Sequence, residues 1–173
     1  MNRFSTSIFC LLSLLFSITA FSQEKVLIWN DEFDGNALKD SLWNIEVNDE
    51  GGGNNELQYY TDRPENLQVE NGNLVITARK ESYQTREYTS ARINTKGKGD
   101  FRYGRFEASI KLPKGQGIWP AFWLLASENI YGQWPNSGEI DIMELLGHEP
   151  DKVYGSIHTG SPYNNETTSY TLQ

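Results

Sequence analysis

Three carboxylates stand close together at residues 139–144, which read Glu-Ile-Asp-Ile-Met-Glu. The alternation with large apolar residues predicts a strand, and on a regular strand Glu139 and Asp141 share one face. Glu144 breaks the period of two, but a β-bulge at Ile142 and Met143 would insert one extra residue and return Glu144 to that face. Carboxylates that are held together repel one another, so a cluster of three indicates acid–base or nucleophilic chemistry.

A helix is the competing interpretation of this segment. At about 100° per residue, Glu139 and Glu144 would lie roughly 140° apart around the helix axis, so the acids would be separated. The run is short and lies between Gly138 and Gly147, which favours the strand. A solvated acidic strand face without any chemistry is a further alternative, which the segment by itself leaves open.

A pair of carboxyl groups is what glycoside hydrolysis requires, since one acts as the acid and the other as nucleophile or base. Retaining enzymes hold the two carboxyls about 5–5.5 Å apart, and inverting enzymes hold them about 6.5–9.5 Å apart. The spacing of Glu139 and Glu144 on a bulged strand permits the shorter distance. Asp141 between them would disfavour ionisation of a neighbour and help to keep one Glu protonated near neutral pH.

The segments that must position these acids alternate apolar and polar residues, as strands do. Asn71-Gly72 between two of them indicates a hairpin turn. Strand patterns recur with Gly, Asn and Pro between them, and no long helical period is present, so the sequence predicts one all-β domain, a sandwich or barrel. Residues 164–173 are polar, and we expect no strand there to complete the pattern. The alternating segments are residues 67–70, 73–78, 90–95, 105–112, 118–125 and 153–158.

Three tryptophans, Trp119, Trp123 and Trp134, precede the acids along the chain. Trp119 and Trp123 fall on one face of the segment at residues 118–125, because they are four residues apart. Such rings either fill a core or stack on the apolar faces of sugar rings. The tryptophans are therefore candidates for a sugar-binding surface, and for Trp123, inside a predicted strand, the core alternative is equally open.

Three polar side chains are further candidates for binding. Asn54 lies in the glycine-rich loop at residues 51–56, where the backbone can approach a ligand closely and an amide can bond to hydroxyl groups. Arg92 and His158 each alternate with apolar residues on their predicted strands. A glycine-rich loop is more often a turn and a single His is more often structural, so these residues gain weight only in combination with the acids.

The first 22 residues have the pattern of a secretory signal peptide: Arg3, then an apolar run over residues 8–16, then Ala20-Phe21-Ser22. We therefore expect export to the extracellular space or the periplasm, and no membrane attachment once residues 1–22 are removed, because the run is too short to span a bilayer. The only cysteine, Cys10, lies in that run, so the remaining chain has no disulfide and no thiolate site. A net charge of −8 argues against nucleic acid as a partner, and we expect a monomer.

The acidic run, together with Trp-Pro-Asn-Ser-Gly at residues 134–138, resembles the catalytic strand of glycoside hydrolase family 16. The spacing resembles the bulged form found in laminarinases, the endo-β-1,3-glucanases. The resemblance extends from about Trp29 to His158, and its motifs are specific jointly. The supporting segments, in chain order, are residues 29–33, 53–61, 90–95, 103–107 and 117–123.

This resemblance implies a β-jelly-roll, a concanavalin-like sandwich of two curved antiparallel sheets with a sugar cleft on the concave side. It implies that residues 23–173 are the N-terminal part of a catalytic domain, because family members continue with several more strands. The implied activity is that of a secreted retaining endo-β-glucanase that hydrolyses laminarin-type β-1,3-glucan through a covalent glycosyl-enzyme.

The resemblance also implies roles for individual residues. Glu139 corresponds to the nucleophile, Glu144 to the acid/base and Asp141 to the residue that supports them. No cofactor is required for catalysis, but a structural calcium ion is implied, with the Glu32 carboxylate and the Gly72 carbonyl among its ligands. The residues implied to line the sugar subsites are Asn54, Arg92, Trp119, Trp123, Trp134 and His158.

Two alternatives stay open within this resemblance. One is a related hydrolase that acts on mixed-linkage glucan, agarose or carrageenan. The other is a non-catalytic glucan-binding domain of the same fold, although the presence of both Glu139 and Glu144 argues for an enzyme.

Overall fold

The computed structural model describes residues 24–172, so the signal-peptide prediction for residues 1–22 lies outside the described part of the chain. Contacts divide the chain into two units, Met1–Asn30 and Asp31–Gln173. Residues 24–30, the described part of the first unit, have no regular secondary structure. Across residues 24–172, no helix has the length and apolar character that a membrane crossing requires.

Between residues 31 and 172 the structure consists of eleven strands and one short 3₁₀ helix, which agrees with the predicted all-β class. In chain order the elements are β1 (Asn44–Glu46), η1 (Gly51–Gly53), β2 (Gln58–Tyr60), β3 (Leu67–Glu70), β4 (Asn73–Ile76), β5 (Arg79–Tyr83), β6 (Arg86–Ser90), β7 (Arg92–Asn94), β8 (Ala121–Leu125), β9 (Glu139–Leu145), β10 (Lys152–Thr159) and β11 (Asn164–Thr171).

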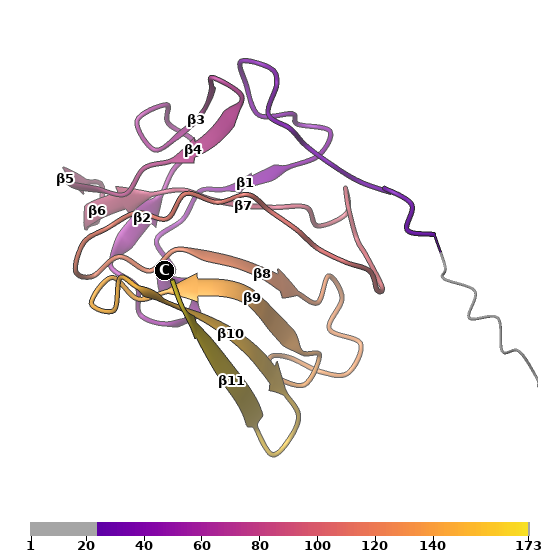
Figure 1. The fold of residues 1–173 in the computed structure, drawn as a ribbon. Coiled ribbons are helices and arrows are strands. Elements are labelled where there is room, and N and C mark those ends of the chain that lie inside the picture. Colours follow the sequence, from indigo (N-terminus) through magenta and orange to yellow (C-terminus); the bar gives the residue numbers. More distant parts are fainter. Residues whose placement is uncertain (1–23, 173) are drawn as a thin grey trace, which may run out of the picture. The chain divides into compact units, whose positions relative to one another are not determined.

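The largest sheet has the strand order β11-β10-β9-β8, and its strands are antiparallel. Figure 1 shows these four strands side by side, with the acidic strand β9 in the interior of the sheet. The other ladders are β1-β7, β2-β6-β5 and β3-β4. One pairing is parallel and not antiparallel as expected, namely that of β2 with β6. These two strands are far apart in the sequence, so no tight hairpin sets their relative direction.

The predicted hairpin at Asn71-Gly72 is confirmed. β3 and β4 pair in register up to Glu70 and Asn73, which leaves Asn71 and Gly72 as the two turn residues. Both have positive φ, 52° and 73°, as a type I′ turn requires, and Asn and Gly are the residues that tolerate this conformation best.

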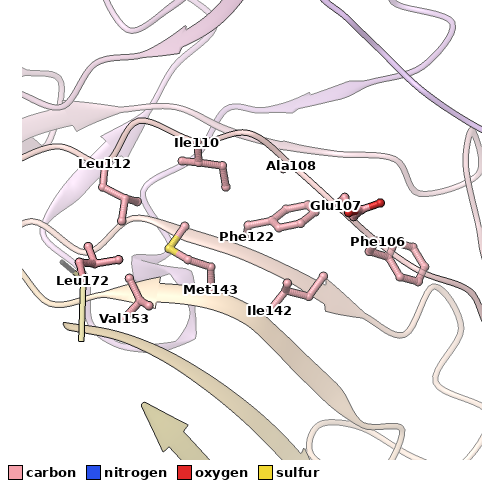
Figure 2. Close-up of a pocket in the computed structure, with 10 residues that line it drawn as sticks. All are labelled: Phe106, Glu107, Ala108, Ile110, Leu112, Phe122, Ile142, Met143, Val153 and Leu172. Carbon is pink, nitrogen blue, oxygen red and sulfur yellow. The ribbon is translucent and has the colours of Figure 1, made fainter. Parts of the chain in front are cut away.

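The predicted bulge in β9 is confirmed by its register with both neighbouring strands. From Glu144 to Asp141 the chain takes three steps, whereas β8 takes two, from Ala121 to Trp123, and β10 also takes two. The extra residue lies at 142–143, as expected. Ile142 and Met143 both line an apolar cavity of about 380 Å³, and Figure 2 shows both side chains directed into it. The bulge therefore gives two consecutive apolar residues to one face of β9 and reverses the alternation beyond them.

The predicted strand at residues 105–112 is wrong as to its backbone pairing but right as to its apolar face, although Glu107 from the other face also lines the cavity. This segment has no strand assignment, and among residues 24–172 none pairs with it in a ladder. An alternating pattern decides which side chains face a core, whereas a strand also needs a neighbouring backbone that satisfies its N–H and C=O groups. Its four alternating apolar residues all line the cavity of Figure 2: Phe106, Ala108, Ile110 and Leu112.

The expectation that residues 164–173 form no strand is also wrong. β11 pairs with β10 along its whole length, from Asn164 opposite Thr159 to Thr171 opposite Lys152. The side chains of β11 are exposed along the whole strand, so no apolar alternation marks it in the sequence. Its threonines nevertheless favour extended backbone, and the hairpin with β10 supplies the hydrogen bonds.

Candidate active site

The three carboxylates project from one face of β9, as the bulge requires. Asp141 is buried, with 5% of its surface exposed, whereas Glu139 and Glu144 on either side are half-buried. A carboxylate oxygen of Glu139, one of Asp141 and a ring nitrogen of His158 all lie within 4.8 Å of one another. The interpretation as a solvated acidic face does not fit this arrangement, because the central acid is almost fully removed from water.

His158 is the partner that compensates the buried Asp141. It lies on β10 directly opposite Glu139, and its Nε2 is 2.9 Å from Oδ2 of Asp141. Its other ring nitrogen, Nδ1, is 2.7 Å from the hydroxyl of Tyr163 in the β10–β11 turn. Sequence reasoning missed Tyr163, because an aromatic residue in a polar turn gives no sign of which strand it bends back to.

An indole N–H group contacts each of the two outer acids. Trp119 donates to Oε1 of Glu144 at 2.9 Å, and Trp134 donates to Oε2 of Glu139 at 2.6 Å. The two rings are 46% and 54% exposed, so both present a face to solvent as a sugar-stacking surface must. These tryptophans therefore have a polar contact with the acids and an apolar surface beside them.

Burial raises the pKa of both Glu139 and Glu144 above the ordinary value of a glutamate. The negative charge of Asp141 is the second cause and raises both pKa values further. The N–H bonds from Trp134 and Trp119 act in the opposite direction by stabilising the carboxylates, but they do not cancel the rise. A glutamate with a raised pKa can hold a proton closer to neutral pH, as a general acid must.

Trp119 and Trp134 form one wall of the site, and Arg92, with the rings of Trp123 and Tyr60, forms a second wall beside the acids. The guanidinium carbon of Arg92 lies 4.7 Å from the Trp123 ring centroid and 6.0 Å from that of Tyr60. Its Nε is 3.2 Å from Oε1 of Glu46 on β1, the strand paired with β7. Trp123 pairs with Asp141 across β8 and β9, so this wall is anchored next to the buried acid. A guanidinium over an indole face holds both planar groups in place.

Asn54 is exposed and follows η1, and its described contacts are local. Its backbone N–H donates to the Gly51 carbonyl at 2.8 Å, and its side-chain Nδ2 lies 3.5 Å from the Gly52 carbonyl. The same loop is tied to the wall of Arg92 by Glu56, which accepts a bond from the Tyr60 hydroxyl at 2.5 Å. The contacts thus bring together every predicted sugar-binding residue except Asn54, whose role stays a prediction.

A cavity of about 220 Å³ lies beside Glu144. Trp119 and Glu144 form part of its lining, so the space is adjacent to the carboxyl that the sequence predicts as the acid/base. The remaining lining residues come from the position just after β9, from β10 and from β11, and they are Leu146, Tyr154, Ser156 and Thr167.

The two predicted calcium ligands offer few oxygen donors. Glu32 carries an exposed carboxylate, and Gly72 lies in the β3–β4 turn. Two oxygen donors are fewer than the six to eight that Ca²⁺ takes, so Glu32 and Gly72 alone do not make a calcium site, and the calcium ion stays a prediction. Within residues 24–172 the one cluster with three potential metal-binding side chains is Glu139, Asp141 and His158. Trp134 bonds to Glu139 and His158 bonds to Asp141, so all three side chains of the cluster already have hydrogen-bond partners.

Comparisons with known proteins agree with this geometry. Residues 54–173 match the family described as glycosyl hydrolases family 16. The chain is 52% identical over 143 residues to a β-glucanase of Rhodothermus marinus, covering 80% of this chain and 50% of that protein. It is 44% identical over 160 residues to a glucan endo-1,3-β-glucosidase of Cryptopygus antarcticus, covering 88% of this chain and 58% of that protein.

A solved structure gives the same result for the fold. The laminarinase from Rhodothermus marinus superposes with a TM-score of 0.80 at 49% identity, covering 84% of this chain and 61% of that one. The predicted β-jelly-roll is thereby confirmed, and the chain spans between half and two thirds of the length of these three proteins. The match covers most of the chain and contains the acidic strand, and the chain belongs to glycosyl hydrolases family 16.

Proposed function

We propose that the full protein is a retaining endo-β-1,3-glucanase that cleaves laminarin-type glucan by double displacement. The observation that carries the proposal is the bulged strand β9, which places Glu139, Asp141 and Glu144 on one face with an indole N–H on each glutamate. The names of the relatives, β-glucanase and glucan endo-1,3-β-glucosidase, support the substrate class.

In the first step Glu144 is the acid and Glu139 the nucleophile. Glu144 donates its proton to the glycosidic oxygen, while the carboxylate of Glu139 attacks the anomeric carbon. The bond from the anomeric carbon to the leaving oxygen breaks, and an ester bond from the sugar to Glu139 forms. The leaving glucan departs as an alcohol, and Glu144 is left as a carboxylate.

In the second step the roles of acid and base reverse at Glu144. Its carboxylate takes a proton from a water molecule, whose oxygen attacks the anomeric carbon as the ester bond to Glu139 breaks. Glu139 leaves as a carboxylate and Glu144 is again protonated, so both groups return to their starting states. Two displacements on opposite faces leave the product with the β configuration of the substrate.

The electrostatics of the site are consistent with these roles. The raised pKa of Glu144 favours the protonated form that the first step needs. Glu139 must be ionised in the same step, and the N–H of Trp134 at 2.6 Å stabilises its carboxylate. The charge of Asp141 disfavours further negative charge beside it and so raises the pKa of both glutamates.

The walls of the site suit a neutral polysaccharide. The exposed faces of Trp119 and Trp134 offer stacking surfaces for the C–H faces of glucose rings, and the guanidinium of Arg92 offers hydrogen-bond donors to hydroxyl groups. A neutral glucan is not repelled by a chain with a net charge of −8. We also propose export through the signal peptide at residues 1–22, because a polymeric substrate lies outside the cell.

The proposal is tested by incubating the full-length protein with laminarin, mixed-linkage glucan, agarose and carrageenan. We expect internal cleavage of laminarin into oligosaccharides, with the β anomer as the first product seen by proton NMR. Cleavage of agarose or carrageenan alone would contradict the substrate class, and an α anomer as first product would contradict double displacement.

Glu139→Ala provides the test of the nucleophile. We expect hydrolysis to fall by at least about 10³-fold while laminarin binding persists, because the glucan-binding walls are untouched. The matched control is Glu70→Ala, an exposed glutamate at the end of β3, which should hydrolyse at the wild-type rate. Binding without hydrolysis in the wild-type protein would instead identify a glucan-binding domain.

A further inference from the structure

Tyr163 is connected to the acids through His158, although it lies outside strand β9 and the two strands that flank it. It lies in the turn between β10 and β11, and half of its surface, 51%, is exposed. Its hydroxyl is nevertheless directed inward, 2.7 Å from Nδ1 of His158, whose Nε2 is 2.9 Å from Asp141. A continuous line of contacts therefore runs from the turn to the buried carboxylate.

The chemistry of the three groups determines which atoms carry the protons. An ionised Asp141 only accepts hydrogen bonds, so the Nε2 atom that faces it must carry a hydrogen. In a neutral imidazole Nδ1 is then an acceptor, and the Tyr163 hydroxyl is the donor that satisfies it. If the ring were rotated by half a turn, the carbon positions would replace the nitrogens and both hydrogen bonds would be lost.

We propose that Tyr163 is a positioning residue whose hydroxyl locks the His158 ring in the orientation and tautomer that direct Nε2–H at Asp141. The proposal rests on the proposed function in one respect, namely that Asp141 supports the two glutamates during hydrolysis. His158 faces Asp141 and Glu139 on β9 with one ring nitrogen, and its other ring nitrogen, on the side away from the acids, bonds to Tyr163 of its own hairpin.

The ring contacts extend the effect to Glu139. The Tyr163 ring is nearly parallel to the His158 ring, at 7° and 6.0 Å between centroids, and it lies 5.5 Å from the Trp134 ring. Trp134 in turn donates its indole N–H to Glu139. The hydroxyl and the ring of Tyr163 thus have separable contacts, since one bonds to His158 and the other packs against Trp134.

Two substitutions separate these contacts. Tyr163→Phe removes the hydroxyl and keeps the ring, and we expect kcat on laminarin to fall about 3- to 10-fold with KM within twofold of wild type, as for the loss of one hydrogen bond. Tyr170→Phe is the matched control, because Tyr170 is exposed on β11 opposite Val153, which lines the cavity on the other face of the sheet. A wild-type kcat for Tyr163→Phe, with a raised KM only in Tyr163→Ala, would show that Tyr163 merely stacks on substrate and would overturn the proposal.

A second measurement needs no substrate. In the ¹⁵N NMR spectrum of the full-length protein we expect the His158 ring to show one tautomer, with the hydrogen on Nε2 and an unprotonated Nδ1. In Tyr163→Phe the two ring nitrogen signals should move toward each other or a second set should appear, whereas Tyr170→Phe should leave them unchanged. A wild-type His158 ring with the hydrogen on Nδ1, or ring nitrogen signals that are unchanged in Tyr163→Phe, would refute the proposed role of the Tyr163 hydroxyl. This result stands whether or not laminarin is cleaved, so it fails independently of the proposed function.

Discussion

Trp119 and Glu144 are joined by a hydrogen bond of 2.9 Å from the indole N–H to a carboxylate oxygen, although they are 25 residues apart in the chain. β8 and β9 create this contact, because Ala121, the first residue of β8, lies opposite Glu144 and Trp119 lies two residues before it. Trp134 has the same relationship to Glu139. Each glutamate therefore has its own N–H donor, and each donor lowers the pKa of its own glutamate.

The first prediction uses this correspondence. Trp119→Phe removes the donor to Glu144 and should raise its pKa, so the basic limb of the kcat/KM profile, where the acid loses its proton, moves to higher pH. Trp134→Phe should raise the pKa of Glu139 and move the acidic limb to higher pH instead. Rates on laminarin oligosaccharides across the pH range test both. If Trp119→Phe moved only the acidic limb, the assignment would be contradicted, since Glu144 would then be the nucleophile and Glu139 the acid.

The second prediction concerns the buried charge at the centre of the site. Asp141→Asn keeps the shape of the side chain but removes the charge that raises the pKa of both glutamates, so both limbs of the pH profile should move to lower pH. We expect kcat to fall by about 10- to 100-fold, less than the 10²–10⁴-fold that loss of an acid–base group costs. The pH profile is the decisive measurement, and unmoved limbs would exclude Asp141 as the source of the raised values.

The third prediction concerns the stack of Arg92 on Trp123, at 4.7 Å. Arg92→Ala should raise KM for laminarin about 5- to 20-fold with a smaller effect on kcat, because a cation–π contact contributes about 0.5–2 kcal/mol. Arg92→Lys should recover little of the loss, since an ammonium group lacks the planar face. Arg105→Ala is the control, because Arg105 is exposed and pairs with Glu107. Full recovery by lysine would show that only the charge matters.

The fourth prediction concerns stability at the end of β9. The Gly147 N–H donates to the Ile118 carbonyl at 2.8 Å, and a Cβ atom at Gly147 would lie 1.8 Å from the Gly115 carbonyl oxygen. Gly147→Ala must therefore push the backbone before Trp119 away from β9, and we expect it to cost about 3 kcal/mol or more in free energy of unfolding. Gly35→Ala is the control, because its nearest non-neighbouring atom would be 3.8 Å away. Urea unfolding measures both, and equal midpoints would contradict the predicted clash.

Local patterns were enough to predict the acidic strand and its bulge. The spacing of Glu139, Asp141 and Glu144 has only one strand solution that gathers all three acids, and that solution requires an extra residue at 142–143. The same period of two predicted that Trp119 and Trp123 share a face, and the structure places both beside the acids. Periodicity succeeds here because the face of a strand follows from the parity of its residues alone.

The same reasoning failed where the outcome depends on a distant partner. Residues 105–112 alternate as a strand does but have no ladder among the described residues, whereas the exposed β11 lacks the alternation and is paired along its whole length. Tyr163 was missed although its partner His158 is only five residues away, because their contact depends on the hairpin of β10 and β11, and β11 was not predicted.

The sequence by itself determined which residue types are present, which face of the acidic strand they occupy and the family to which the chain belongs. Only the tertiary structure decided how these groups are joined: the indole donors on Glu139 and Glu144, the burial of Asp141 against His158, and the inward hydroxyl of Tyr163. The physical reason is that side-chain direction is a local property of the backbone. Hydrogen bonding, burial and the resulting pKa shifts arise between strands that only the fold brings together.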